Sequence, residues 1–126
     1  MKEHFLGTDH PAIAVADVDA MADWYCDTLG YTKKAGKAGG PWLLAGPDGV
    51  YLEVMRQDDS PRPERANLTP GWSHLALRVD NLDAAIEALD AKKVQWTAEI
   101  VGAVGGGRLR NFVDPDGNAW QIVERS

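Results

Sequence analysis

Two histidines and two carboxyl or carboxamide side chains occupy matching positions in a sequence that repeats itself. The segment that begins with His10 aligns with the segment that begins with His74. A second alignment, of two Pro-Asp-Gly turns and the residues after them, pairs Glu53 with Gln121. Two imidazoles, one carboxylate and one carboxamide oxygen form a mixed donor set that suits a divalent ion such as Zn²⁺, Ni²⁺, Co²⁺, Mn²⁺ or Fe²⁺. The repeat therefore predicts a metal site, at which an open coordination position would allow the ion to polarise a substrate oxygen.

Each of these donors is expected on a strand, on the face that is free of large apolar side chains. In residues 10–16, Ile13 and Val15 alternate with small residues, and residues 74–79 repeat this pattern. In residues 118–123, Gln121 faces away from the bulky β-formers in the same way. Glu124 has the opposite parity to Gln121, so we reject it as the fourth ligand.

A helix follows the first strand of each half. Asp17 or Asp19 can cap the first helix, and Gly30 supplies its left-handed end. Asn81 or Asp83 can cap the second helix, which is expected to end at the following pair of lysines. The helical spacing of apolar residues in both segments predicts one buried stripe on each helix.

Short extended segments follow each helix, so each half has the order βαβββ. These segments are expected at residues 31–35, 42–45 and 50–56 of the first half and at residues 94–101, 108–113 and 118–124 of the second. The proline-rich and charged residues 57–71 are typical of a linker. We expect a single α+β domain over residues 1–126, with module one at about 8–56 and module two at about 72–126.

Composition excludes several classes of protein. A formal charge of −6 and a pI near 4.9 argue against binding to nucleic acid or to an anionic membrane. No apolar run is long enough to span a bilayer, and the amino-terminal residues lack the pattern of a signal peptide. The single cysteine, Cys26, permits no internal disulfide and is expected to be a small packing residue. We therefore expect a cytoplasmic protein.

Three parts of the sequence resemble the vicinal oxygen chelate superfamily. They are the histidine that opens the first strand, the segment Asp17–Tyr31, and the Asp-Pro-Asp-Gly-Asn segment before the last strand. This superfamily includes glyoxalase I, methylmalonyl-CoA epimerase, extradiol dioxygenases, fosfomycin-resistance enzymes and bleomycin-binding proteins. Residues 71–81 and the Gly105-Gly106 pair are most similar to bacterial glyoxalase I. The resemblance implies two βαβββ modules that form a curved, barrel-like mixed sheet with the helices outside, and it implies a homodimer.

The resemblance also implies metal ligands at His10, Glu53, His74 and Gln121, and the activity of a metal-dependent lyase or isomerase. Such an enzyme chelates vicinal substrate oxygens and stabilises an enediolate. Glyoxalase I normally has glutamate at the position of Gln121, where it acts as the catalytic base. A carboxamide cannot accept a proton usefully, so Glu53 is expected to be the base here.

Two other functions stay open. The missing base at Gln121 favours a non-catalytic protein that binds a bleomycin-type antibiotic. His10, His74 and Glu53 also form a two-histidine, one-carboxylate set of the kind that binds Fe²⁺ in oxygenases, which would suit an extradiol-type dioxygenase. An epimerase is disfavoured because it needs two opposed bases. The metal could be held within one chain or across two.

Four further residues are candidates for binding a small-molecule substrate. Arg78 shares the face of His74, Arg108 and Arg110 lie beyond the glycine-rich residues 102–107, and Tyr51 shares the face of Glu53. An arginine could hold an anionic group such as a carboxylate. The glycine-rich residues precede a strand instead of opening a helix, so we expect a loop at the rim of the site and no dinucleotide fingerprint.

Overall fold

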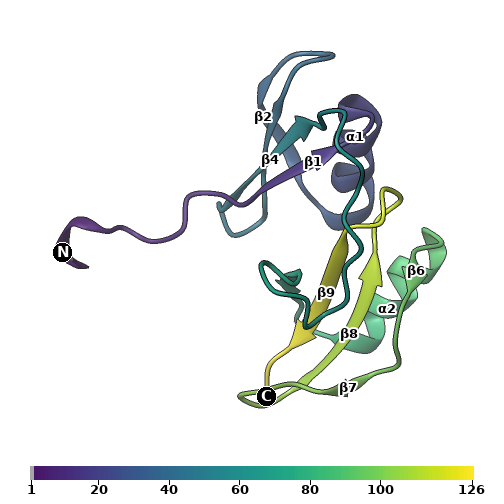
Figure 1. Cartoon of the computed structure of the whole chain (residues 1–126). Helices are drawn as coiled ribbons and strands as arrows, with labels where there is room; N and C mark the ends of the chain where they lie inside the picture. Colours follow the sequence, from purple (N-terminus) through teal and green to yellow (C-terminus); the bar gives the residue numbers. More distant parts are fainter. Residues whose placement is uncertain (1) are drawn as a thin grey trace. The chain divides into compact units, whose positions relative to one another are not determined.

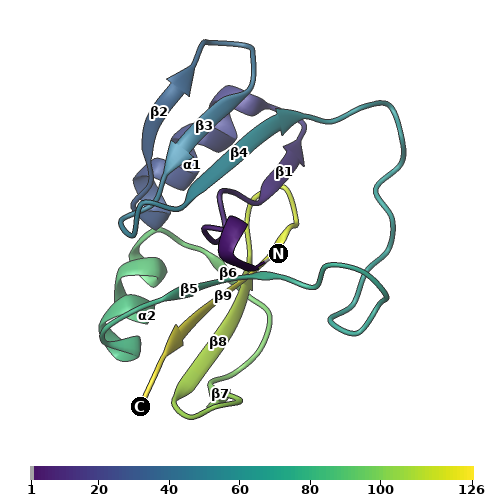
Figure 2. The ribbon, with the colours of Figure 1, turned by 90° about the vertical axis from the view of Figure 1, so that its left-hand side faces the viewer.

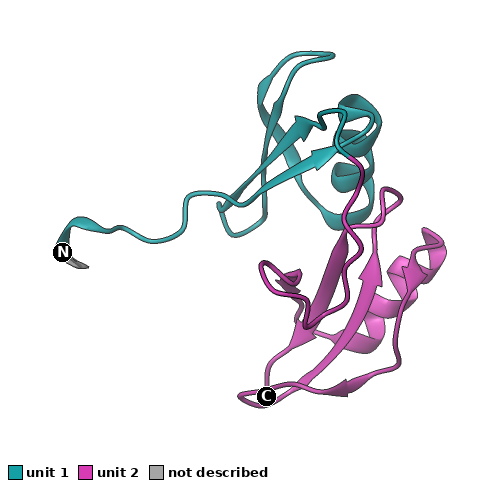
Figure 3. Ribbon diagram, in the orientation of Figure 1, with its two compact units in different colours: residues 1–60 teal, residues 61–126 magenta. Residues whose placement is uncertain are grey.

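The computed structural model describes residues 2–126 and contains two compact units, Met1–Ser60 and Pro61–Ser126 (Figures 1 and 3). The boundary between the two units lies inside the segment expected as a linker. Unit 1 contains module one and unit 2 contains module two. The assignment of both modules to one domain stays a prediction.

Unit 1 is a mixed four-stranded sheet with one α-helix against it (Figure 2). A short 3₁₀ helix, η1 (Lys2–His4), precedes these elements. The sheet order is β1-β4-β3-β2, in which β1 and β4 are parallel and the other neighbours are antiparallel. The elements are β1 (Ala12–Val15), α1 (Val18–Leu29), β2 (Thr32–Gly36), β3 (Trp42–Ala45) and β4 (Tyr51–Arg56).

The ends of α1 are determined by side-chain and backbone chemistry. The Asp17 carboxylate accepts a hydrogen bond from the backbone N–H of Ala20 at 3.0 Å, and Gly30 ends the helix with φ at 81°. Asp19, the alternative cap, instead accepts a hydrogen bond from the indole Nε1 of Trp42 at 2.8 Å. The sequence left two candidate caps, and Asp17 is the one that is used.

The core of unit 1 lies between α1 and the sheet. The helix contributes the buried side chains of Met21 and Tyr25, and β4 contributes those of Leu52 and Val54. Burying one such side chain stabilises the fold by roughly 1.5–3 kcal/mol. Because successive side chains of a strand point to opposite faces, the burial of Leu52 and Val54 places Glu53 on the face away from the helix.

Unit 2 repeats this arrangement with one added strand. Its sheet order is β5-β9-β8-β6, and β7 also pairs with β8. β5 and β9 are parallel, as β1 and β4 are in unit 1. The elements are β5 (Leu75–Arg78), α2 (Leu82–Ala91), β6 (Gln95–Trp96), β7 (Val101–Gly102), β8 (Arg108–Val113) and β9 (Ala119–Glu124).

The helix α2 is capped by Asn81, whose side chain accepts a hydrogen bond from the backbone N–H of Ala84 at 3.0 Å. It ends at Lys92, and Lys93 follows with φ at 60°. Of the two predicted caps, Asn81 and Asp83, Asn81 is the one used, and the helix ends at the predicted pair of lysines.

The strand expected at residues 94–101 is instead two short strands. Trp96 pairs with Phe112 and Val101 pairs with Leu109, so this edge contains two more residues than β8 does between the same partners. The carbonyl of Ala98, in the gap, accepts a hydrogen bond from the side chain of Arg110. The extra residues break the ladder, which composition alone does not reveal.

The architecture is mixed α+β with two sheets and two α-helices in the described chain, in agreement with the predicted class. Both sheets are open, since each has two edge strands, and neither unit contains a closed barrel. No helix among residues 2–126 is long and apolar enough to cross a membrane.

Candidate functional site

Unit 1 brings two of the predicted metal ligands together. Glu53 of β4 is paired with Ala12 of β1, and His10 lies two residues before Ala12. The Nε2 atom of His10 is 3.9 Å from Oε1 of Glu53, and each side chain is 36% exposed. The other ring nitrogen of His10, Nδ1, is 2.7 Å from a carboxylate oxygen of Asp9. A half-exposed imidazole and a carboxylate thus lie side by side on the helix-free face.

Unit 2 places the other two predicted ligands in the equivalent register. Gln121 of β9 is paired with Ala76 of β5, and His74 lies two residues before Ala76. The Nδ1 atom of His74 is 2.8 Å from the hydroxyl oxygen of Ser73, the residue that precedes it. The strand pairing therefore reproduces the correspondence of His10 with His74 and of Glu53 with Gln121 that the repeated sequence indicates.

The two units differ in the residue opposite the second donor. Asn111 of β8 lies opposite Gln121, and its Oδ1 accepts a hydrogen bond from Nε2 of Gln121 at 2.9 Å. Leu43 of β3 lies opposite Glu53 in the same relation. Gln121 is buried, with 9% of its surface exposed. Asn111 was not among the predicted site residues, because the alignment alone does not show which residue lies across the sheet.

Each unit contributes two donors of types that suit a divalent ion such as Zn²⁺ or Ni²⁺. Imidazole nitrogen with carboxylate or carboxamide oxygen is a set that such ions accept. Within residues 2–126, no group of three or more His, Cys, Asp or Glu side chains is close enough to hold a metal ion. Each unit by itself supplies two donors, and the meeting of all four at one ion stays a prediction.

Arg108 and Glu124 lie on the helix side of the sheet in unit 2. The Nη2 atom of Arg108 is 3.6 Å from Glu124 and 3.6 Å from Asp83. Oε1 of Glu124 accepts a hydrogen bond from the backbone N–H of Leu82, the first residue of α2. Glu124 therefore caps the helix, in keeping with its rejection as a ligand, and Arg108 lies on the face opposite Gln121.

Arg110 also lies on that helix side, since it is paired with Ile122. Its guanidinium carbon is 4.3 Å from the ring centre of Trp96, and its Nε donates a hydrogen bond to the carbonyl of Ala98 at 3.0 Å. These contacts stabilise the irregular edge of the sheet. The structure does not bring Arg108 or Arg110 to the face that carries the donors.

Arg78 and Tyr51, the other two candidates, are on the donor faces of their sheets. Arg78 is exposed and, with Val79, Asp80 and Arg125, lines an open cavity of about 400 Å³. Tyr51 is half-buried and lies two residues before Glu53 on β4. Their part in substrate binding stays a prediction.

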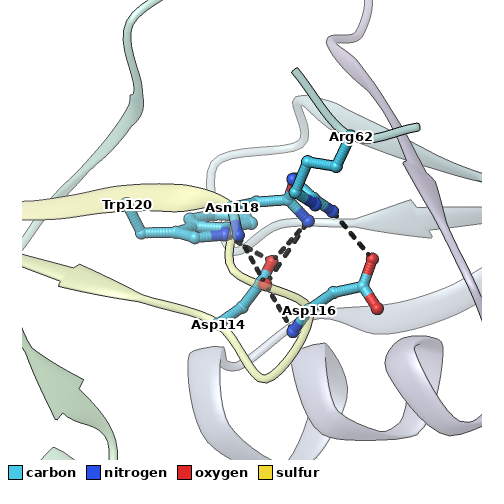
Figure 4. Close-up of polar contacts among 5 residues, drawn as sticks. All are labelled: Arg62, Asp114, Asp116, Asn118 and Trp120. Carbon is cyan, nitrogen blue, oxygen red and sulfur yellow. Dashed lines mark hydrogen bonds and ion pairs between the residues drawn. The ribbon is translucent and has the colours of Figure 1, made fainter. Parts of the chain in front are cut away.

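A buried carboxylate that the sequence did not single out organises the turn before β9 (Figure 4). Asp114 is 3% exposed and accepts hydrogen bonds from the backbone N–H of Asp116 at 2.9 Å, from that of Asn118 at 3.0 Å and from the indole of Trp120 at 3.0 Å. Arg62 contacts the same turn through the side chains of Asn118 and Asp116. The Asp-Pro-Asp-Gly-Asn motif predicts the turn, but not the burial of its first aspartate. The hydrogen bonds of Asp114 stabilise the turn that leads into β9, the strand that carries Gln121.

Cys26 is half-buried in α1, and burial raises the pKa of its thiol. A thiol that is harder to ionise is a poorer nucleophile. This supports the expectation that Cys26 packs and does not react.

Comparisons with known proteins agree with the fold. A family model described as the Glyoxalase/Bleomycin resistance protein/Dioxygenase superfamily matches residues 7–122. The uncharacterized protein YaeR of Escherichia coli (strain K12) is 31% identical over 122 residues, covering 92% of this chain and 94% of that protein. The structure of lactoylglutathione lyase from Agrobacterium tumefaciens is similar with a TM-score of 0.73 and 19% identity, over 95% of this chain and 94% of that one. TnmS3, an antibiotic-binding protein from Streptomyces sp. CB03234, is similar with a TM-score of 0.70 and 24% identity, over 97% and 98% of the two chains.

Proposed function

Since the chain belongs to the Glyoxalase/Bleomycin resistance protein/Dioxygenase superfamily, we propose that it is a glyoxalase-like, metal-dependent lyase or isomerase of a small molecule. The observation that carries this proposal is the equivalent register of the two donor pairs, His10 with Glu53 and His74 with Gln121. One ion would be held by all four, either within one chain or across two chains of a homodimer. The two sheets would then curve around the ligand in a barrel-like arrangement.

In the proposed reaction Glu53 transfers the proton, and Gln121 only binds the ion. A divalent ion bound there would draw charge from two neighbouring substrate oxygens and so stabilise an enediolate. Glu53 is the only carboxylate of the four, and it takes the proton from the carbon that bears one of these oxygens. Glu53 then returns the proton to the adjacent carbon, so the reaction is an isomerisation that needs no other reactant. Gln121 binds through its oxygen and moves no proton.

The test begins with the metal content of the purified protein, measured before and after incubation with Ni²⁺, Co²⁺, Zn²⁺ or Mn²⁺. The metal-loaded protein is then assayed with the methylglyoxal–glutathione hemithioacetal. Glu53→Gln is expected to reduce kcat by about 10²–10⁴-fold, the usual contribution of a general base. The control is Glu99→Gln, because the side chain of Glu99 is 93% exposed and lies in the other unit from Glu53.

Two results would contradict the proposal. Full activity of Glu53→Gln would refute the role of Glu53 as the base. A protein that takes up none of the four metals would refute the metal-dependent reaction. In the second case the protein would be assigned to the binding class described next.

The alternative is a protein that binds an antibiotic-like molecule without changing it. Gln121 favours this function, because a carboxamide cannot replace the usual base. An antibiotic-binding protein also has the same fold. Calorimetric titration of the metal-free protein with bleomycin tests this alternative. Tight binding together with no turnover of the hemithioacetal would support it.

A further inference from the structure

Both histidines of the donor pairs contact the side chain of the residue before them, at equivalent positions in the two units. Nδ1 of His10 is 2.7 Å from Asp9, and Nδ1 of His74 is 2.8 Å from Ser73. A carboxylate can only accept, so the Nδ1–H of neutral His10 donates to Asp9 and its Nε2 keeps a free lone pair. The hydroxyl of Ser73 can accept from His74 in the same way. The Asp9 contact selects the tautomer that a metal ligand needs, and the Ser73 contact is compatible with the same tautomer.

The carboxamide of Gln121 is oriented from across the sheet. Its Nε2 donates to Asn111, and Oε1 forms no hydrogen bond among residues 2–126. Gln121 is buried, so its carboxamide has little freedom to turn. The equivalent neighbour of Glu53 is Leu43, which offers no hydrogen bond. Within the described chain, Glu53 therefore contacts His10 alone through its charged group, at 3.9 Å.

We propose that Asp9, Ser73 and Asn111 are positioning residues that hold three donor atoms ready for the ion, while Glu53 is left free to turn. This inference rests on the proposed function and explains why Glu53 and Gln121 have different neighbours across the sheet. A ligand that only binds gains from being held in one orientation, because less conformational entropy is lost when the ion arrives. A base must turn between the substrate carbons, and the apolar neighbour Leu43 leaves it that freedom.

The first experiment uses the metal-free protein and NMR. In the wild type, the side-chain NH₂ signals of Gln121 should be shifted and should exchange slowly, and the imidazole nitrogens of His10 should show the Nδ1–H tautomer. Asn111→Leu should move the Gln121 signals toward those of an exposed glutamine. Asn111→Asp keeps an acceptor and should leave them protected. Asp9→Ala should shift His10 toward the Nε2–H tautomer, whereas Asp9→Asn should not.

The second experiment measures Ni²⁺ affinity by calorimetry. Loss of a residue that orients a metal ligand typically weakens binding by about 10–100-fold, which is the effect expected for Asn111→Leu, Ser73→Ala and Asp9→Ala. Asn111→Asp, which retains an acceptor for Gln121, should bind Ni²⁺ at least as tightly as the wild type. This control separates loss of the orienting hydrogen bond from a general effect of substitution at position 111. Circular dichroism confirms that each variant is folded.

The outcomes separate the two proposals. Asn111→Leu with wild-type Gln121 signals and wild-type Ni²⁺ affinity would overturn the positioning role. If the wild-type protein binds no metal but shows the predicted amide and tautomer signals, the metal-dependent function is refuted. The orientation of Gln121 and His10 by their neighbours is then still supported.

Discussion

Replacing Asp114 with alanine should destabilise the fold. Asp114 is almost completely buried and accepts hydrogen bonds from four groups: the backbone N–H groups of Asp116 and Asn118, the side-chain amide of Asn118, and the indole of Trp120. The truncation removes all of these hydrogen bonds at once. Trp120 is 1% exposed, so its indole N–H cannot turn to bulk water.

The magnitude follows from the burial of each donor. A buried donor that loses its acceptor costs about 1–3 kcal/mol, and each backbone N–H, which water can reach at this half-exposed turn, costs about 0.5–1 kcal/mol. The expected loss is therefore about 2–5 kcal/mol in the free energy of unfolding. For a chain of this size that corresponds to a decrease in Tm of roughly 8–20 °C.

The assay is urea unfolding followed by circular dichroism, with a thermal scan beside it. The control is Asp48→Ala in the turn of unit 1, where an exposed carboxylate accepts one hydrogen bond, from Val50 at 3.0 Å. This control should cost about 0.5–1 kcal/mol. The reasoning is refuted if Asp114→Ala costs no more than Asp48→Ala, because the buried position would then add nothing.

Three further outcomes are expected. Burial and then the charge of Asp48 raise the pKa of Tyr31 to about 12. Neutral Tyr31 therefore stabilises the fold below about pH 10, and this stability is lost as the pH rises toward about 12. Absorbance titration should show one tyrosine that ionises at unusually high pH and is absent from Tyr31→Phe. Gln121→Glu should tighten Ni²⁺ binding by about tenfold or more, because a carboxylate replaces a neutral oxygen; unchanged affinity would argue against coordination at this position. The indole of Trp42 and then the backbone of Gly39 lower the pKa of Asp19, so its contribution to stability is present above the ordinary pKa and is lost at lower pH; carboxyl NMR titration should show a higher pKa in Trp42→Phe.

Local chemistry predicted most of the elements. Gly30 and Asn81 mark the ends of helices through effects confined to a few residues; Gly30 was predicted from the sequence, and Asn81 was one of two predicted caps. The expectation that Glu53 lies on the face free of large apolar side chains agrees with the burial of Leu52 and Val54 on the other face of β4. These inferences succeed because helix caps and strand parity depend on neighbours in the sequence.

Contacts across the sheet were beyond such reasoning. Asp17 caps α1, whereas Asp19 accepts a hydrogen bond from Trp42, which lies on β3 and is distant in the sequence. Asn111 was missed for the same reason, because its contact with Gln121 comes from strand register and not from spacing in the sequence. The convergence of the four donors at one ion stays a prediction for the metal titrations.

The parallel pairing of the first and last strands in each unit has a consequence for how such a chain can evolve. In each unit the last strand returns to pair with the first, β4 with β1 and β9 with β5, so every sheet is completed by its own strands. A duplicated segment of this kind brings all its hydrogen-bond partners with it. Each copy can then change its own cross-strand neighbours, as Leu43 and Asn111 illustrate, without disturbing the backbone of the other. A twofold repeat can in this way acquire an asymmetric chemistry through a pair of substitutions in one half.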